Sequence, residues 1–323
     1  MFYKDSLDLI GNTPIVEIGC FDTGNSRLFL KLENQNPSGS IKDRIGKSII
    51  ESAEARGLLK PGATLIEATA GNTGLGLALV ALKKGYKLVL VIPDKMSAEK
   101  IAHLKALGAK IVMTRSDVAK GHPEYYQDYA LRLSQETENS FFINQFCNLD
   151  NPLAHSTTTG PEIWQHMDGK VDAIVVGVGS GGTLRGLTDY FKTLPAPPEF
   201  VLADPAGSIL ADYIMTGKHD EPGSWYVEGI GEDFVPEMCD FSLVKAAYTI
   251  TDAQAFATIR ALLKKEGILA GTSSGVLIAA AVRYAQQQVQ SKNIITFVCD
   301  TGNKYLSKVF NDDWMRERGF SVE

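Results

Sequence analysis

The chain has 323 residues, of which 44% are hydrophobic and 22% are charged, a composition typical of soluble globular proteins and not of disordered or fibrous ones. Its formal net charge is -6 and no basic cluster stands out, which argues against nucleic acid as a partner. No apolar run approaches the roughly 20 residues of a membrane-spanning helix, and the N-terminus lacks the apolar core of a secretory signal. We expect a cytoplasmic protein without membrane contact, long enough for two domains.

The four cysteines, Cys20, Cys147, Cys239 and Cys299, lie far apart and form no C-x-x-C pair. This spacing predicts neither a disulfide framework nor a zinc site, and it fits a reducing compartment. We expect each cysteine to be a small buried apolar side chain. The histidines also lack metal-ligand spacing, so no metal site is predicted, and no role in an active site is assigned to His155.

The first half of the chain alternates helical and strand-like patterns. Apolar residues at helical spacing follow Lys42, which itself follows a Pro/Gly turn. Residues 64–68 predict a short strand, which leads through a Gly-rich turn into a helix over residues 75–84. The continuous apolar run 87–92 is typical of a strand buried on both faces. The sequence also predicts a helix capped by Ser97 and a strand over residues 109–114.

The second half repeats this alternation. Residues 172–177 predict a strand that leads through a second Gly-rich turn into a helix. Thr251 caps a helix that runs to about residue 266, and Ser274 begins another that ends near residue 290. Further strands are expected over residues 200–203 and 293–299. Because strands that alternate with helices form parallel sheets, the expected fold class is α/β.

Two domains are expected, each a mostly parallel twisted sheet flanked by helices. The seam is expected near residues 148–152. We predict a smaller N-terminal domain over residues 43–148, which carries the first Gly-rich turn. The larger domain is then formed by residues 1–42 and 149–323, and it carries the second Gly-rich turn.

Residues 36–44, N-P-S-G-S-I-K-D-R, contain a candidate catalytic lysine. The Pro/Gly turn delivers Lys42 to the start of a helix. A lysine beside a positive helix N-terminus, in a partly buried turn, loses its proton more easily. The neutral amine is the form that Schiff-base chemistry needs. Taken alone, this lysine is better explained as an ordinary surface residue.

Two Gly-rich turns each join a predicted strand to a helix. T-A-G-N-T-G, residues 69–74, offers hydroxyls, an amide and backbone N–H groups, which together bind anions such as carboxylates. G-V-G-S-G-G-T, residues 177–183, lets the backbone approach a phosphate, with Ser180 and Thr183 as hydroxyl donors. Each could instead be an ordinary capped turn. Asp204 ends the next predicted strand, so a dinucleotide site is a further alternative.

Together with G-T-S-S-G at residues 271–275, these segments resemble the cysteine synthase/cystathionine β-synthase family of fold-type II pyridoxal-phosphate enzymes, whose fold is similar to the tryptophan synthase β subunit. The elements S-G-S-I-K-D-R, T-x-G-N-T-G, G-S-G-G-T and G-x-S-S-G occur in the family's order and approximate spacing. The resemblance covers nearly the whole chain. It implies pyridoxal 5′-phosphate as cofactor and replacement of the β-substituent of a small amino acid by a thiol.

The resemblance assigns roles to individual residues. Lys42 matches the catalytic lysine that forms the internal aldimine with the cofactor and then removes the substrate's α-proton. Asn72 matches the amide that bonds the cofactor's 3′-oxygen, and Ser273 matches the serine that faces its pyridine nitrogen. The phosphate loop is Gly179, Ser180, Gly181, Gly182 and Thr183; the clamp for the substrate carboxylate is Thr69, Ala70, Gly71, Thr73 and Gln145; and Gly229 borders the substrate cleft.

The implied reaction passes through an aminoacrylate, to which the thiol adds. A serine at position 273 holds the pyridine nitrogen protonated less firmly than a carboxylate would. We therefore expect prompt β-elimination in preference to a long-lived carbanion.

Three segments favour the cystathionine β-synthase branch, which joins serine or O-acetylserine to homocysteine. Residues 204–210 resemble D-P-x-G-S-I-L, residues 228–236 resemble E-G-I-G-x-D-F-x-P, and the tail 300–320 carries D-x-W-M. We expect neither a haem-binding extension nor tandem regulatory domains. It follows that neither haem binding nor a response to S-adenosylmethionine is predicted.

Three alternatives remain open at this point. A cysteine synthase would join O-acetylserine and sulfide; some bacterial enzymes that use O-acetylserine share the T-A-G-N-T-G turn, and Glu232 stands where eukaryotic cystathionine synthases often have tyrosine. A catalytically silent partner of serine acetyltransferase would not need Lys42, Asn72 and Ser273 intact. A nicotinamide-dependent dehydrogenase would leave Lys42 unexplained. Small amino-acid and thiol substrates and a homodimer are the partners that the resemblance implies.

Overall fold

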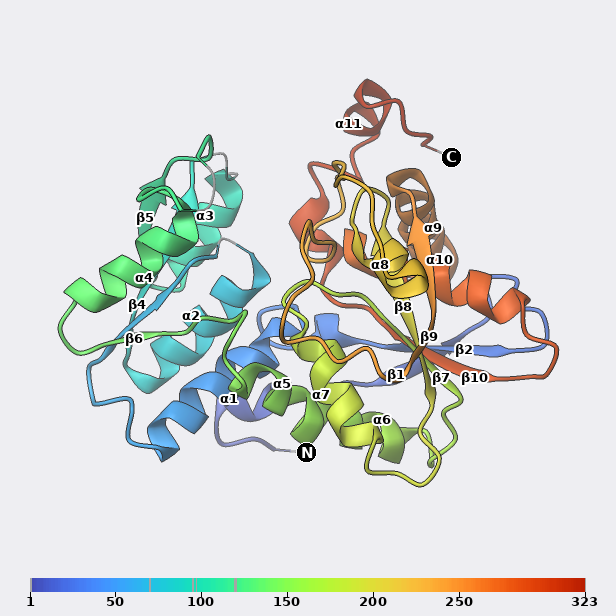
Figure 1. The fold of residues 1–323 in the computed structure, drawn as a ribbon, viewed down its shortest axis with the longest axis horizontal. Helices are drawn as coiled ribbons and strands as arrows, with labels where there is room; N and C mark the ends of the chain where they lie inside the picture. The colour runs from blue at the N-terminus through green and yellow to red at the C-terminus, as the bar shows by residue number, and fades with distance from the viewer. Residues whose placement is uncertain (1, 70, 95, 97, 119–120, 323) are drawn as a thin grey trace. The chain divides into compact units, whose positions relative to one another are not determined.

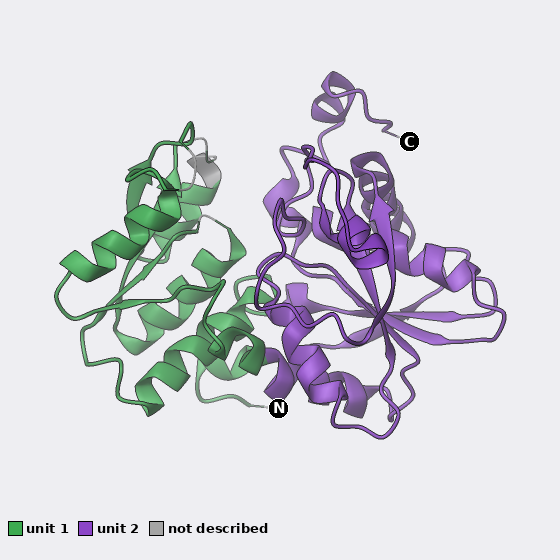
Figure 2. Ribbon diagram, in the orientation of Figure 1, with its two compact units in different colours: residues 1–11, 36–154 green, residues 12–35, 155–323 purple. Residues whose placement is uncertain are grey.

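A computed structural model of the chain describes residues 2–69, 71–94, 96, 98–118 and 121–322. It divides into two compact units (Figure 2): unit 1 comprises residues 1–11 and 36–154, and unit 2 comprises residues 12–35 and 155–323. These limits differ from the domain limits expected from the sequence. Lys42 lies in unit 1 because it begins helix α1 (Lys42–Ala55), and unit 1 extends past residue 148 because helix α5 (Asp150–Ala154) packs on α1.

Unit 1 contains a four-stranded sheet in the order β5-β4-β3-β6, in which every pair of neighbours is parallel (Figure 1). Leu90 and Ile92 of β4 pack on one face, while Ile66 and Val91 pack on the other, so the prediction of a strand buried on both faces is confirmed. The strands are β3 (Thr64–Glu67), β4 (Lys87–Pro93), β5 (Lys110–Thr114) and β6 (Ser140–Phe142).

Helices cover both faces of this sheet. The larger cluster of apolar side chains includes Ile45 and Ile49 of α1 and Leu77 of α2, while Ala130 of α4 belongs to the smaller cluster on the opposite face. The predicted cap Ser97 lies outside the described residues. Besides α1 and α5, the helical elements are η1 (Ser6–Leu9), α2 (Asn72–Lys84), α3 (Ala98–Ala106) and α4 (Tyr126–Glu136).

Unit 2 contains a six-stranded sheet in the order β1-β2-β10-β7-β8-β9. Only β1 is antiparallel to its neighbour, and the other pairs are parallel. The sequence patterns identified β7, β8 and β10, but they missed β1, β2 and β9. The strands are β1 (Ile15–Ile18), β2 (Arg27–Lys31), β7 (Ala173–Val176), β8 (Glu199–Pro205), β9 (Val244–Ile250) and β10 (Asn293–Phe297).

The helices of unit 2 include one whose start follows local sequence rules. Thr251 accepts from the backbone N–H of Gln254, and the Gln254 side chain accepts from Thr251, so the predicted cap of α9 is confirmed. By contrast, the helix expected from Ser274 to about residue 290 is α10 (Thr272–Gln286), because Gly271 is its N-cap. The helical elements are η2 (Glu33–Gln35), η3 (His155–Thr159), α6 (Gly160–His166), α7 (Gly182–Phe191), α8 (Leu210–Thr216), α9 (Asp252–Glu266), α10, η4 (Gly302–Tyr305) and α11 (Asp312–Glu317).

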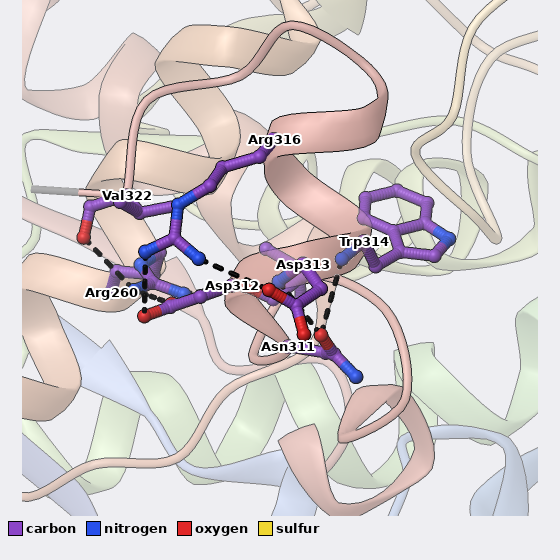
Figure 3. Close-up of polar contacts among 8 residues, drawn as sticks. Arg260, Asn311, Asp312, Asp313, Trp314, Arg316 and Val322 are labelled. Carbon is purple, nitrogen blue, oxygen red and sulfur yellow. Dashed lines mark hydrogen bonds and ion pairs between the residues drawn. The ribbon is translucent and has the colours of Figure 1, made fainter.

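The C-terminal segment is tied to α9 by one arginine (Figure 3). Arg260 donates to the carbonyl oxygens of Val309 and Val322, both at 3.0 Å, and pairs with Asp312 at 2.6 Å. Trp314 of α11 packs edge-on against Phe256 of α9, with ring centroids 6.0 Å apart. These contacts hold residues 306–322 on the body of unit 2.

The expectation that all four cysteines are buried is wrong. Cys147 is exposed, and Cys20, Cys239 and Cys299 are half-buried, so none is enclosed in a core. Apolar spacing was too weak a signal to place them, because each lies in a turn or at an element end. No described helix combines the length and the apolar character that crossing a bilayer requires.

Candidate active site

Two glycines lock the helices of unit 1 that carry Lys42 and Asn72. A Cβ atom on Gly46 of α1 would lie 2.7 Å from the carbonyl carbon of Gly76 of α2. A Cβ atom on Gly76 would lie 2.5 Å from the carbonyl oxygen of Lys42. Because backbone meets backbone here, no side chain fits between the two helices. The glycines therefore set the first residue of α1 directly against the first turns of α2, where Asn72 lies.

Lys42 is half-buried and follows a tight turn. Gly39 has a φ of 78°, which only glycine adopts without strain, and the hydroxyl of Ser40 accepts from the backbone N–H of Lys42 at 3.3 Å. The buried carboxylate of Asp43 accepts from the backbone N–H of Ser38 at 2.7 Å and from its hydroxyl. The predicted start of a helix at Lys42 is confirmed, and these bonds hold that start in one conformation.

The predicted carboxylate clamp comes from two turns of unit 1. We call residues 69–74 the clamp loop and residues 143–146 the Gln145 turn. The hydroxyl of Thr73 donates to Oε1 of Gln145 at 2.7 Å, and both side chains are buried. Thr69 accepts from the backbone N–H of Gly71 at 3.3 Å. Ala70, also assigned to the clamp, lies outside the described residues.

The Gln145 turn is fixed to the end of β3 by a residue that sequence reasoning did not assign. The backbone N–H of Gln145 donates to Oε2 of Glu67 at 3.1 Å, although the two residues are 78 positions apart. Asn151 also donates from its side chain to the carbonyl oxygen of Gln145 at 2.8 Å. Unit 1 thus brings together the clamp residues Thr73 and Gln145 at the carboxyl end of a parallel strand.

In unit 2, the predicted phosphate loop follows β7 and leads into α7. A Cβ atom on Gly179 would lie 2.8 Å from the carbonyl oxygen of Gly229, and one on Gly181 would lie 2.6 Å from Sγ of Cys239. Gly181 is the N-cap of α7, with a φ of 87°. The loop therefore presents bare backbone at a helix N-terminus, the arrangement that binds phosphate groups.

The thiol beneath Gly181 stays neutral. Burial raises the pKa of Cys239 to about 12, and the nearby carboxylate of Glu232 raises it further. Burial also raises the pKa of Glu232 to about 8, with added repulsion from Asp233 and Asp204. At neutral pH, Cys239 is therefore a neutral thiol and adds no negative charge to the loop.

His155 supports the phosphate loop, although no role was assigned to it from the sequence. Its Nε2 lies 3.2 Å from the hydroxyl oxygen of Thr183, and its Nδ1 lies 2.9 Å from that of Thr159. The imidazole is completely buried, and it lies in the single π-helical turn η3, a feature frequent at functional sites. Its spacing from Thr183 follows no local period, so no sequence signal could have identified it.

The remaining predicted residues of unit 2 are Ser273, in helix α10, and Gly229, in the segment between α8 and β9. Ser273 is buried in the first turn of α10, and α10 packs on β7. Gly229 has a φ of 89°, and a Cβ atom there would meet nothing within 4 Å, so its conformation alone favours glycine. Asp300, which accepts from the hydroxyl of Tyr305 at 2.9 Å, packs against the N-cap Gly271 of α10.

Asp204 lies at the carboxyl end of β8, as predicted, but its side chain is not available to a dinucleotide. Its side chain is completely buried and accepts from the backbone N–H of Ala211 at 2.8 Å, at the start of α8. Burial raises its pKa to about 6, partly offset by bonds from Ala211 and Ser208. The carboxylate therefore bonds to the first turn of α8 and is not exposed. It is not placed to bind a ribose hydroxyl, which is evidence against the dinucleotide site.

Residues 7–300 match a family model described as "Pyridoxal-phosphate dependent enzyme". The chain belongs to this family, and its cofactor is pyridoxal phosphate. The loop of unit 2 fits this group in its chemistry, because it offers glycine backbone at the N-terminus of α7 and carries the hydroxyl residues Ser180 and Thr183.

Two kinds of curated relatives are similar to the chain over nearly its whole length. It is 42% identical over 322 residues to cystathionine beta-synthase of Oryctolagus cuniculus, covering 99% of this chain but only 58% of that protein. It is 40% identical over 319 residues to cysteine synthase A of Escherichia coli (strain K12), covering 98% of both proteins. The chain thus spans little more than half of the first relative and nearly all of the second.

Solved structures agree with this fold. The structure of O-ureido-L-serine synthase has a TM-score of 0.88 at 32% identity and covers 98% of this chain and 100% of that one. A hydrogen sulfide-producing enzyme of Fusobacterium nucleatum has a TM-score of 0.86 at 34% identity, covering 94% of this chain and 98% of its own. The predicted α/β fold, with mostly parallel sheets flanked by helices, is confirmed.

Proposed function

We propose that the chain catalyses β-replacement, condensing serine or O-acetylserine with homocysteine to give cystathionine. Within unit 1, the glycine contact between α1 and α2 holds Lys42 and Asn72 at adjoining helix starts, and Thr73 and Gln145 form a paired polar clamp. This is the set that an amino-acid substrate needs: an amine to move a proton, and the Gln145 amide, oriented by the Thr73 hydroxyl, as a donor for a carboxylate.

Each residue then has one task in the proposed reaction. Pyridoxal phosphate, when bound, supplies the electron sink that acidifies the α-carbon of the amino acid. Lys42 holds the cofactor and moves the proton at that carbon. Thr73 and Gln145 bind the substrate carboxylate, with Asn72 and Ser273 facing the cofactor ring and residues 179–183 holding its phosphate. We also assign Thr69 and Gly71 to the clamp and Gly229 to the border of the substrate cleft.

One observation favours cystathionine as the product. The three segments that resemble the cystathionine β-synthase branch converge in unit 2, although they are far apart in sequence. Ser208 donates to the carbonyl oxygen of Glu232 at 3.1 Å. From the tail, Lys308 forms an ion pair with Glu228 at 2.6 Å. The ring of Trp314 packs against that of Tyr226, with centroids 5.8 Å apart. Tyr226 and Glu228 immediately precede Gly229, so the branch-specific tail supports the loop assigned to the cleft.

Cysteine synthesis from O-acetylserine and sulfide is the second candidate. It is supported by the match to cysteine synthase A of Escherichia coli, in which 98% of both chains is aligned. The half-buried Glu232 also departs from the tyrosine common in eukaryotic cystathionine synthases.

The two candidates are separated by product analysis. Purified protein loaded with cofactor is given serine or O-acetylserine, each with homocysteine or with sulfide, and the products are identified by mass. Cystathionine as the favoured product supports the proposal. Cysteine without cystathionine from either donor would assign the chain to cysteine synthesis, and no β-replacement by protein that holds its cofactor would contradict both candidates.

Lys42 is tested with a matched lysine on the same helix. Lys42→Ala removes the amine and is expected to abolish turnover, with a loss of about a thousandfold or more for a nucleophilic and proton-transferring group. Lys47→Ala removes an α1 lysine that only donates to the carbonyl oxygen of Leu7 at 3.1 Å. Equal activity in the two variants would contradict the role of Lys42.

We further propose that the protein forms a homodimer and can bind serine acetyltransferase. Both proposals rest on the family resemblance alone. Light scattering of the purified protein, alone and with an acetyltransferase, gives the two masses. A monomer that leaves the acetyltransferase unbound would contradict both.

A further inference from the structure

Glu67 carries a carboxylate in an unexpected place. It is the last residue of β3 and is only 3% exposed. The clamp loop begins two residues later. A carboxylate is almost never fully buried unless it is paired, so its presence here calls for a physical reason.

The carboxylate joins the two turns that carry the clamp. Its Oε1 accepts from the backbone N–H of Ala68 at 2.7 Å, and its Oε2 accepts from the backbone N–H of Gln145 at 3.1 Å. The backbone N–H of Asn144 also lowers the pKa of this carboxyl group through a hydrogen bond. One oxygen therefore faces the strand that enters the clamp loop, and the other faces the Gln145 turn.

The electrostatics agree with this geometry. Burial raises the pKa of Glu67 to about 7, and the N–H groups of Ala68, Gln145 and Asn144 lower it in part. No side-chain charge contributes to the shift. Burying a carboxylate without a cation lowers the stability of the fold, so a neutral residue at position 67 would be more stable. The carboxylate is therefore explained by the backbone N–H groups, which donate to it.

The turn that Glu67 holds is conformationally specific. Asn144 has a φ of 52°, a left-handed conformation that requires support from its surroundings. The turn directs Gln145 so that its Oε1 accepts from the hydroxyl of Thr73 at 2.7 Å. Among the residues that the structure describes, Nε2 of Gln145 donates to none, which leaves its two protons for a ligand.

We propose that Glu67 is a positioning residue, whose carboxylate holds the Gln145 turn against the clamp loop so that Thr73 and Gln145 bind the substrate carboxylate as one unit. The inference rests on the proposed function, because it assumes an amino-acid substrate. It extends that function by naming a residue that touches neither substrate nor cofactor and acts only through Gln145.

The test measures the selectivity for a carboxylate by binding and not by turnover. Serine and serinamide differ only in that group, and the dissociation constant of each is read from the change in the visible spectrum of the bound cofactor. The titrations are made at about pH 8, above the pKa of Glu67 of about 7. The proteins are wild type, Glu67→Gln, Gln145→Ala and the double variant, all loaded with cofactor.

Glu67→Gln is expected to weaken serine binding by about ten- to fiftyfold, because an amide places an N–H group where the backbone N–H groups need an acceptor. Serinamide binding should change less than about threefold, since the amide lacks the charge that the clamp selects. The KM for the amino-acid donor should rise by a similar factor with kcat nearly unchanged. The double variant should bind serine no more weakly than Gln145→Ala, because Glu67 acts through Gln145.

A control separates positioning from loss of stability. Leu88→Ala removes a core side chain near the start of β4, where it pairs with Leu65 of β3 and not with Glu67, and it should lower stability while the ratio of serine to serinamide affinity stays unchanged. Should Glu67→Gln not fold, Glu67→Asp carries the test, because it keeps the charge but cannot reach both turns. The same loss of selectivity is expected from it.

The outcomes are distinct. A wild-type spectrum that responds to serine, with an unchanged ratio in the Glu67 variants, would overturn the inference alone. The inference would also be overturned if the loss of serine affinity in the double variant equalled the product of the two single losses. Glu67 would then act independently of Gln145. A wild-type spectrum that responds to no amino acid would overturn the proposed function and the inference with it.

Discussion

The two units each contain a turn from a parallel strand to a helix, but the turns are built differently. In unit 1, the turn from β3 to α2 presents side chains, with Thr73 bonded to Gln145 and Glu67 behind them. In unit 2, the turn from β7 to α7 presents backbone, with Gly179 and Gly181 packed so closely that a Cβ atom would clash. The same local geometry is therefore suited to two kinds of anion, if the turns bind as proposed.

The difference fits the two anions that the proposed reaction involves. A carboxylate is planar and is selected by directed side-chain donors, whereas a phosphate is bound by several backbone N–H groups at a helix N-terminus. The side-chain turn depends on a buried charge and is sensitive to pH. The backbone turn depends on space and is sensitive to added volume.

The largest expected effect concerns pH and the side-chain turn. The pKa of Glu67 rises from 4.5 to about 7 on folding, so the folded state holds its proton more tightly than the unfolded state. The proton on Glu67 therefore favours folding below about pH 4.5, and this contribution is lost as pH rises through about 7. The loss in the free energy of unfolding is on the order of 3 kcal/mol at most.

Removing the ionisable group should flatten this dependence. The stability of Glu67→Gln, measured by urea unfolding, should increase relative to wild type as pH rises from about 5 to about 8. Since other groups titrate equally in both proteins, the difference between them isolates Glu67. Parallel curves for the two proteins over this range would contradict the assigned shift.

The next effect concerns volume in the backbone turn. Gly179→Ala places a methyl group 2.8 Å from a carbonyl oxygen, and overpacking of this kind costs about 1–3 kcal/mol. We expect affinity for pyridoxal phosphate to fall by up to about a hundredfold, measured by equilibrium dialysis. Gly71→Ala is the matched change in the other turn, where the nearest atom, Oγ1 of Thr69, is 3.9 Å away. It should retain the cofactor; equal loss in both would remove the distinction between the turns.

A pair of isosteric changes compares the hydroxyls of the two turns. Thr73→Val and Thr183→Val each remove one hydroxyl, and a neutral hydrogen bond contributes about 1 kcal/mol, or roughly fivefold in affinity. Thr73→Val should raise the KM for the amino-acid donor and leave cofactor affinity unchanged. Thr183→Val should do the reverse, and a common effect on both constants would show that the turns are not specialised.

The smallest effect is expected behind the backbone turn. His155→Gln keeps a polar side chain but changes the bond that Nε2 makes to Thr183 at 3.2 Å. We expect cofactor affinity to fall by about two- to fivefold, because the hydroxyl remains and only its orientation is lost. Phosphorus NMR of the bound cofactor would report the change in the phosphate environment, and a spectrum identical to wild type would exclude this role.

Much of this fold follows from local sequence rules. The capping box of Thr251 and Gln254, the helix that begins at Lys42, and the apolar run that forms β4 were all predictable, because each depends on residues within a few positions. The Gly-rich turns and the family resemblance also identified the cofactor. The strands β1, β2, β6 and β9 were missed, since none of them shows the clear alternation or the continuous apolar run by which a strand is predicted.

The support of the candidate site was decided only by tertiary structure. Glu67 and Gln145 are 78 positions apart, and His155 and Thr183 are 28 apart, so no pattern along the chain connects either pair. The contact of Gly46 with Gly76, which sets Lys42 against α2, has the same character. A buried polar group must find its partner wherever packing brings one, and packing depends on the whole chain. The sequence by itself therefore determined the family, its cofactor and the residues proposed to bind it, and the tertiary structure decided what holds those residues in place.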